Sequence, residues 1–171
     1  MIPSEQFISF IADIKDNKEV LKMKKFIQHY DTNCYDHCYE VAFLSFLICK
    51  KLHLDYKAAA RAGFLHDLFL YDWHIKGGDN KRLHGLRHPY IALRNSLVLF
   101  NLSKKEQDII KKHMWPLTVI PPRYLESYVV SFVDKYCAIA ESVRYYKENI
   151  KLQKFYRYAY LFFGLMIFRS M

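Results

Sequence analysis

The sequence predicts an all-α fold, and three observations lead to it. Apolar residues recur at three- and four-residue spacing through most of the chain, which is the period of a helix with one buried face. No run alternates cleanly between apolar and polar residues, and no Asn-Gly or Asp-Gly turn joins two such runs. Only 5 Gly and 5 Pro interrupt 171 residues that are 52% apolar. We therefore expect residues 1–171 to form a single helical bundle with one substantial core.

Two helices are expected before residue 30. Residues 4–14 carry their apolar side chains on one face, and residues 18–29 repeat the pattern less regularly. The first stripe consists of Phe7, Phe10, Ile11 and Ile14. The second consists of Val20, Leu21, Met23, Phe26 and Ile27.

The next two predicted helices each place a histidine among apolar residues. Residues 31–33 are a break with good capping side chains, and the helix after them runs to about residue 53. Its apolar stripe includes His37. A further helix over 54–70 has Ala59 and Ala62 on the face that holds His66, so close helix packing should bring His66 deep into the core. Asp67 follows directly, about 100° round the helix.

Residues 71–87 form the longest polar interval and contain three of the five glycines. Loops on a rigid scaffold often carry recognition residues. Four residues of this interval are candidates for that role: Trp73, His74, His84 and Arg87.

Three helical segments complete the chain before its end. One opens at His88 with proline in its first turn. A second begins with a capping box, Ser103 and Glu106, and carries His113. The last begins near residue 124 and aligns Asp134 with apolar positions and with Glu141.

Residues 150–171 are expected to form a closing helix. The run 158–168 is strongly apolar but too short to span a bilayer, which takes ~20 residues. A buried helix is the favoured interpretation, and contact with a membrane surface or a second copy is the alternative.

Six inward-facing polar residues make up the candidate metal site: His37, His66, Asp67, His88, His113 and Asp134. Any one of them could be a hydrogen-bonded core residue. All six aimed at one interior are harder to explain in that way, because each buried polar group needs its own partner. Neutral imidazole together with carboxylate suits divalent transition metals.

The same residues carry a family resemblance. His37 lies in DHCYEVA, His66-Asp67 in AARAGFLHD and Asp134 in SFVDKYCA, in this order on successive predicted helices. Over residues 31–140 this set resembles the HD-domain superfamily of metal-dependent phosphohydrolases. The resemblance implies an all-α bundle and a metal centre built from His37, His66, Asp67 and Asp134.

Many members of that family bind a second ion through additional histidines, and His88 and His113 match their placement. The resemblance thus implies two divalent ions (Fe, Mn, Zn, Ni or Co) with Asp67 between them. The alternative is one ion, with His88 and His113 binding substrate phosphate.

The expected activity is hydrolysis of a phosphate ester or anhydride of a nucleotide-like substrate by a metal-bound hydroxide. Asp67, Lys135 and Arg87 form the candidate catalytic set, with the two cations neutralising phosphate charge. Arg61 and Arg123 are weaker candidates for the same role. Asp72 could act as a general acid or cap a helix end. A catalytically inactive HD scaffold that binds a nucleotide or a protein is the competing hypothesis.

The sequence also departs from the family. Leu68-Phe69-Leu70-Tyr71 follows the His-Asp pair where many members have Ile-Gly-Lys, and the GYP element is missing. These differences argue against the branch that cleaves signalling cyclic dinucleotides, and they leave the substrate open.

The net charge limits the kinds of partner that we expect, and the cysteine content indicates the cellular compartment. The net charge of +9 suits an acidic partner such as a phosphorylated small molecule, anionic lipid or nucleic acid, or it is simply a basic surface. Nucleic acid is less favoured because the basic residues are spread along the chain. The four cysteines form no CxxC pair, and Cys34 and Cys38 are expected to be core thiols rather than metal ligands. No secretory signal is visible, so we expect a cytoplasmic protein.

Overall fold

The computed structural model describes residues 3–72 and 84–169, with side chains described as far as residue 154. This part of the chain contains eight α-helices, a short 3-10 helix and one two-stranded hairpin, so the predicted all-α class is confirmed. The elements are α1 (Glu5–Phe10), α2 (Ala12–Lys15), α3 (Lys18–Leu21), η1 (Lys22–Lys25), β1 (Ile27–His29), β2 (Thr32–Asn33), α4 (Cys34–Lys51), α5 (Tyr56–Leu65), α6 (His84–Leu99), α7 (Lys104–Lys112) and α8 (Leu125–Arg169).

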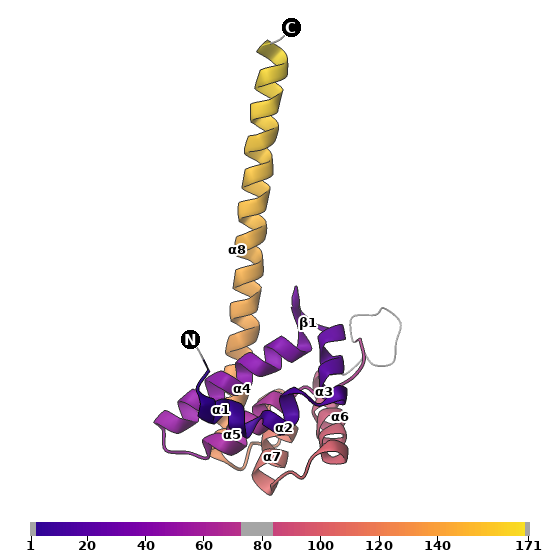
Figure 1. Cartoon of the computed structure of the whole chain (residues 1–171), viewed down its shortest axis with the longest axis vertical. Coiled ribbons are helices and arrows are strands. Elements are labelled where there is room, and N and C mark those ends of the chain that lie inside the picture. The colour runs from indigo at the N-terminus through magenta and orange to yellow at the C-terminus, as the bar shows by residue number, and fades with distance from the viewer. Residues whose placement is uncertain (1–2, 73–83, 170–171) are drawn as a thin grey trace.

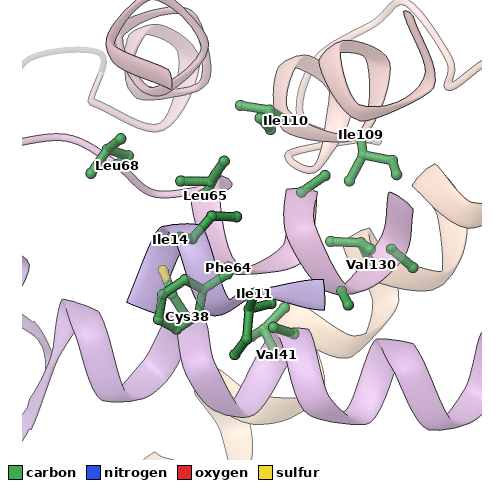
Figure 2. Packing of buried hydrophobic residues seen from close by; sticks show 14 of the residues in the cluster. Ile11, Ile14, Cys38, Val41, Phe64, Leu65, Leu68, Ile109, Ile110 and Val130 are labelled. Atoms are coloured by element: carbon green, nitrogen blue, oxygen red, sulfur yellow. The ribbon is translucent and has the colours of Figure 1, made fainter. Parts of the chain in front are cut away.

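Helices α4 and α5 form the centre of the bundle. The side chain of Asn33 caps α4 by accepting from the amide of Asp36, as the break at 31–33 predicts. A Cβ added at Gly63 of α5 would lie 3.1 Å from the Cα of Ala42 of α4, so the two backbones approach closely because Gly63 has no side chain. Figure 2 shows residues from α4, α5, α7 and α8 meeting in this core.

The N-terminal segment is more broken than its sequence pattern predicts. The expected helix over 4–14 is divided into α1 and α2 at Ile11. The expected helix over 18–29 was wrong beyond Lys25, because the chain there becomes the β1–β2 hairpin, which pairs Ile27 with Asn33. The hairpin packs on α4 and α8 and so brings its side chains to the middle of the molecule.

Helix α5 ends earlier than predicted. It stops at Leu65 with His66 as its C-cap, instead of continuing to about residue 70. Helix α6 already includes residues from His84, so Pro89 lies inside the helix and not in its first turn. The capping box of Ser103 and Glu106 is confirmed at the start of α7.

Helix α8 extends well beyond the other elements. Its 45 residues begin at Leu125, close to the predicted start, and Figure 1 shows the later part projecting from the bundle. Residues 150–169 are helical as expected, but they continue α8 instead of forming a separate helix. We expected these residues to be buried, but the structure describes their side chains only as far as residue 154, so their burial stays a prediction. None of the described helices is both long enough and apolar enough to cross a membrane.

Candidate metal centre

His37 lies on the inner face of α4 and is completely buried. Its Nε2 atom is 3.2 Å from Oδ1 of Asp134, and its Nδ1 atom is 2.9 Å from Oε1 of Glu141. Both carboxylates belong to α8 and are one heptad apart, so they project from the same face of that helix. Helices α4 and α8 are therefore joined through both ring nitrogens of one imidazole.

His66 and Asp67 reach the same place because α5 ends at Leu65, directly before them. Neighbouring residues within a helix point in different directions, but Asp67 comes after the C-cap and is released from that constraint. The Nδ1 atom of His66 lies 2.8 Å from the carbonyl oxygen of Gly63. Its Nε2 atom is 3.4 Å from Oδ2 of Asp67 and 3.5 Å from Oδ1 of Asp134.

His88 of α6 and His113, the C-cap of α7, complete the cluster. Their Nε2 atoms are 2.8 Å apart and lie 3.1 Å and 3.4 Å from Oδ1 of Asp67. Each Nδ1 atom is 2.8 Å from a backbone carbonyl, that of His84 and that of Ile110 respectively. All six residues of the predicted metal site thus lie together, and they come from five separate parts of the chain.

The four imidazoles share one orientation that fits a metal ion. In His66, His88 and His113 the Nδ1 atom faces a carbonyl, and in His37 it faces a carboxylate, so in each ring Nδ1 must carry the hydrogen and donate it. The four Nε2 atoms are directed at the cluster, and in the neutral rings each would offer its lone pair to an ion there. Metal-binding histidines in proteins are held in this way, with the outer nitrogen bonded to an acceptor.

Unsatisfied polar atoms give an independent test of that fit. Nε2 of His66 and Oδ1 of Asp67 are among the described buried atoms without a well-aligned hydrogen bond, although charged groups lie 3.1–3.5 Å away. A polar atom buried in this way costs about 1–3 kcal/mol unless something pairs with it. Among the described residues, four sets have possible ligand atoms within 4.8 Å of one another: His29-His37-Glu141, His37-His66-Asp67, His66-His113-Asp134 and Asp67-His88-His113. The donors and their spacing therefore fit divalent ions.

The protonation of the cluster follows from burial and from charge pairing. Burial opposes a charge on His37, but hydrogen bonds to Asp134 and Glu141 raise its pKa well above 6.5. Burial likewise opposes the charge on Asp67, yet the charge of His66 holds the pKa of that carboxyl below 3.8. For His113 burial prevails and lowers the pKa to about 3. The metal-free cluster is thus held together by protons that an ion would displace.

A cavity of about 240 Å³ opens onto the cluster. Asp67, His88, His113 and Asp134 form its inner wall, and His84 and Lys135 are among the other residues that line it. The Nζ atom of Lys135 donates to the carbonyl of His113 at 2.9 Å. The ring of His84 stacks on that of His88 with centroids 4.6 Å apart. Lys135, predicted to bind phosphate, and His84, predicted to serve in recognition, thus both lie at the site.

The other predicted cations lie elsewhere. Arg87 lines a separate surface groove with Tyr90 and Arg94. Arg61 binds Asp13 and Glu106 in an ion-pair network and is not among the residues that line the cavity at the cluster. The remaining candidates fall into two groups: Arg123 and Asp72 are exposed, and Trp73 and His74 lie outside the described residues.

Three residues that lie against the cluster were not among the predicted site residues: His29, Gln28 and Glu141. His29, in β1, lines the cavity, and its ring centroid lies 5.2 Å from that of His37. The side-chain amide of Gln28, in β1, donates to Oδ2 of Asp67. Its position could not be foreseen because that segment was expected to be helical. Glu141 did have a signal in the sequence, since it follows Asp134 by seven residues on the same helical stripe.

The cysteines near the cluster behave as core thiols. Cys34 and Cys38 are fully buried, and burial raises the pKa of the Cys38 thiol well above 9. Cys34 donates through its sulfur to the backbone carbonyl of Asp67 at 3.3 Å. All four cysteines are free thiols, and none belongs to the ligand groups found among the described residues.

Comparison of the chain with models of known protein families, with curated proteins and with solved structures gave no match. The chain is thus shown to be a helical protein with a buried histidine and aspartate cluster that could hold metal ions.

Proposed function

We propose that this protein is a metal-dependent phosphohydrolase of the HD type. The observation that carries the proposal is the common orientation of His37, His66, His88 and His113, whose Nδ1 atoms are all bonded outward while their Nε2 atoms converge on two aspartates. An inactive scaffold would have no need to keep four imidazoles in this arrangement at the cost of unsatisfied buried atoms.

The residues divide into two ligand groups. His37, His66 and Asp134 would hold one ion, His88 and His113 would hold a second, and Asp67 lies between them with one oxygen toward each side. Bound divalent ions would supply Lewis acidity, which lowers the pKa of water and neutralises phosphoryl charge. The protein contributes a buried frame whose outer hydrogen bonds keep each ring in place.

Substrate would enter through the cavity beside α6 and α8. Its 240 Å³ accommodates a phosphoryl group and the adjoining part of an ester, with Lys135 and His84 at its wall. Burial lowers the pKa of Lys135 below 10.5. Its ammonium donates to the carbonyls of His113 and Ser131 and lies 4.0 Å from Oδ2 of Asp134, so it is a cation beside the cluster that would neutralise phosphate. A nucleotide-like phosphate ester remains the proposed substrate class, and four free thiols agree with the expected cytoplasmic setting.

Metal content and hydrolysis test the proposal together. The full chain is purified, loaded with Mn²⁺, Fe²⁺, Co²⁺, Ni²⁺ or Zn²⁺, measured for bound metal, and assayed on an aryl phosphate and a panel of nucleotides. We expect about two ions per chain and metal-dependent release of phosphate. His66→Ala should lower the metal content to about one ion per chain and abolish hydrolysis, while His53→Asn, at an exposed position with φ 56°, should change neither. Wild-type protein that takes up no transition metal would refute the metal centre, and loaded protein inactive on every substrate would refute the hydrolase.

A further inference from the structure

Helix α8 has two apolar faces on opposite sides. One side packs into the bundle and carries Val130, Val133 and Cys137 together with the site residues Asp134 and Glu141. The other side is exposed, and there a polar surface would be expected. Instead it carries eight large apolar residues that are 36% to 71% exposed: Leu125, Tyr128, Phe132, Tyr136, Ile139, Val143, Tyr146 and Ile150.

These eight residues, called here the outer stripe, follow the helical repeat closely. Successive members are three or four residues apart from Leu125 to Ile150. At 3.6 residues per turn they all fall within about 80° of the helix circumference. Scattered exposed apolar residues are normal on a protein surface, but a continuous stripe seven turns long marks a contact surface.

The outer stripe stays largely exposed although two of its members have aromatic neighbours, Trp115 beside Tyr128 and Tyr30 beside Tyr146. Figure 1 shows the later part of α8 projecting beyond the bundle. Helices that stand alone in water are marginally stable, so a long projecting helix with an apolar face calls for a partner.

The geometry points to a second copy of this chain as that partner, and we propose that two α8 helices pair in parallel along their outer stripes. Apolar residues at alternating three- and four-residue spacing are the pattern by which identical helices pack side by side. The exposed area also fits. With roughly half of each side chain available, at ~150–250 Å² for an aromatic one, the stripe offers on the order of 800 Å². A stable interface buries about that area on each partner.

The charges beside the stripe are compatible with the parallel arrangement. Beside Tyr146 and Ile150, at the C-terminal end of the stripe, one edge carries Lys147 and Lys151 and the other carries Asn149. In a parallel pair related by a two-fold axis, these lysines face the neutral edge of the partner and do not face each other.

Sedimentation of the full chain tests whether the pair forms. Wild-type protein at tens of micromolar should sediment at twice its mass of 20.6 kDa. Ile139→Glu combined with Val143→Glu should reduce the mass to that of one chain, because four carboxylates would meet in the apolar seam. The control pair Ile139→Leu and Val143→Leu keeps the stripe apolar and should stay dimeric. A monomeric wild type, or a dimer that survives the glutamates, would overturn the proposal.

Single-cysteine cross-linking tests the geometry. The native cysteines are all buried, so a new surface thiol reports on its own position. In a parallel pair Ile139→Cys meets its own copy and should form a disulfide-linked dimer on mild oxidation. Glu148→Cys, on the side away from the outer stripe, should remain unlinked. Equal linking at both positions would contradict the proposed face.

A vesicle assay distinguishes a second copy of the chain from a membrane surface as the partner of the outer stripe. An apolar stripe with a basic edge could also lie on anionic lipid. Chain that is monomeric in solution and sediments with phosphatidylserine vesicles, but not with phosphatidylcholine vesicles, would replace the second copy by a membrane surface and refute the pairing. Wild type that remains dimeric and ignores both vesicles supports it.

Discussion

The Nδ1 atom of His37 lies 2.9 Å from Oε1 of Glu141, and both side chains are shielded from solvent. The second oxygen of Glu141 has no hydrogen-bond partner among the described residues. A buried carboxylate with a single hydrogen bond destabilises the fold unless a positive charge lies close by. His37 supplies that charge when protonated, and an ion on its other nitrogen would supply it when the proton is displaced.

Glu141→Gln should therefore weaken metal binding although Glu141 is itself not a ligand. The substitution keeps the shape and an acceptor oxygen but removes the charge that makes His37 a better donor to an ion, so we expect affinity to fall roughly 10–100-fold. Competition with a chromophoric chelator measures this directly. Glu148→Gln, an exposed carboxylate on the same helix, is the matched control and should leave the affinity unchanged. Equal affinities for both variants would contradict this role for Glu141.

His113→Ala should separate the two ligand groups. With two ions, the variant keeps the first group and loses one ligand of the second, so metal content should fall from about two ions per chain to about one. If instead a single ion is bound and His113 contacts phosphate, metal content stays at one and only the KM of the substrate rises. Elemental analysis beside steady-state kinetics distinguishes these outcomes, with circular dichroism to confirm that the variant folds.

Lys135→Ala should impair hydrolysis without loss of metal. A charge-assisted hydrogen bond contributes about 1.5–3 kcal/mol, so removing a cation that binds phosphate should lower kcat/KM by roughly 10–100-fold. The ammonium also holds the carbonyl of His113, at 2.9 Å, so metal content must be measured in the same preparation. Lys147→Ala on the exposed part of α8 is the control. A variant with full activity would remove Lys135 from the proposed site.

The stability of the bundle should depend on Glu126 at acid pH. Burial raises the pKa of this carboxyl, but its bonds to Lys105 at 2.8 Å and to the amide of Asp55 at 2.9 Å outweigh burial and bring the pKa below 4.5. A carboxyl whose pKa is lower in the folded state stabilises the fold at any pH above its unfolded-state pKa, which is about 4.5. This contribution is lost as the pH falls through the folded-state pKa.

Glu126→Gln should therefore cost about 1 kcal/mol of unfolding free energy at pH 7 and progressively less below pH 4.5. Urea unfolding at pH 7 and at pH 3.5 measures the difference. Glu148→Gln again serves as the control, with no cost expected at either pH. A cost that is the same at both pH values would show that the charge of Glu126 is not what stabilises the contact.

The sequence predicted the parts of the fold that local chemistry determines. The break at 31–33, the capping box of Ser103 and the start of α8 each depend on a few neighbouring residues, and all three were found. The six site residues stood out because charged and imidazole groups interrupt helical apolar stripes. Their meeting at one place follows from a bundle in which each stripe faces the same core.

What could not be predicted depends on contacts between distant residues. Gln28 reaches Asp67 only because residues 27–29 form a strand, and a pairing of two or three residues gives no periodic signal. The end of α5 at Leu65 likewise has no glycine or proline to mark it. Arg87 looked like a phosphate ligand from its place before His88, but adjacent residues on a helix face different ways.

The bond between His37 and Asp134 joins positions 97 residues apart. An ion held by both side chains would act on the chain as a cross-link that closes a long loop, and the entropy of closing a loop changes only slowly with its length. Ion binding would then contribute directly to folding, since the unfolded chain offers no preformed site. The part of the chain between α4 and α8 would become one cooperative unit whose unfolding temperature depends on the concentration of free metal.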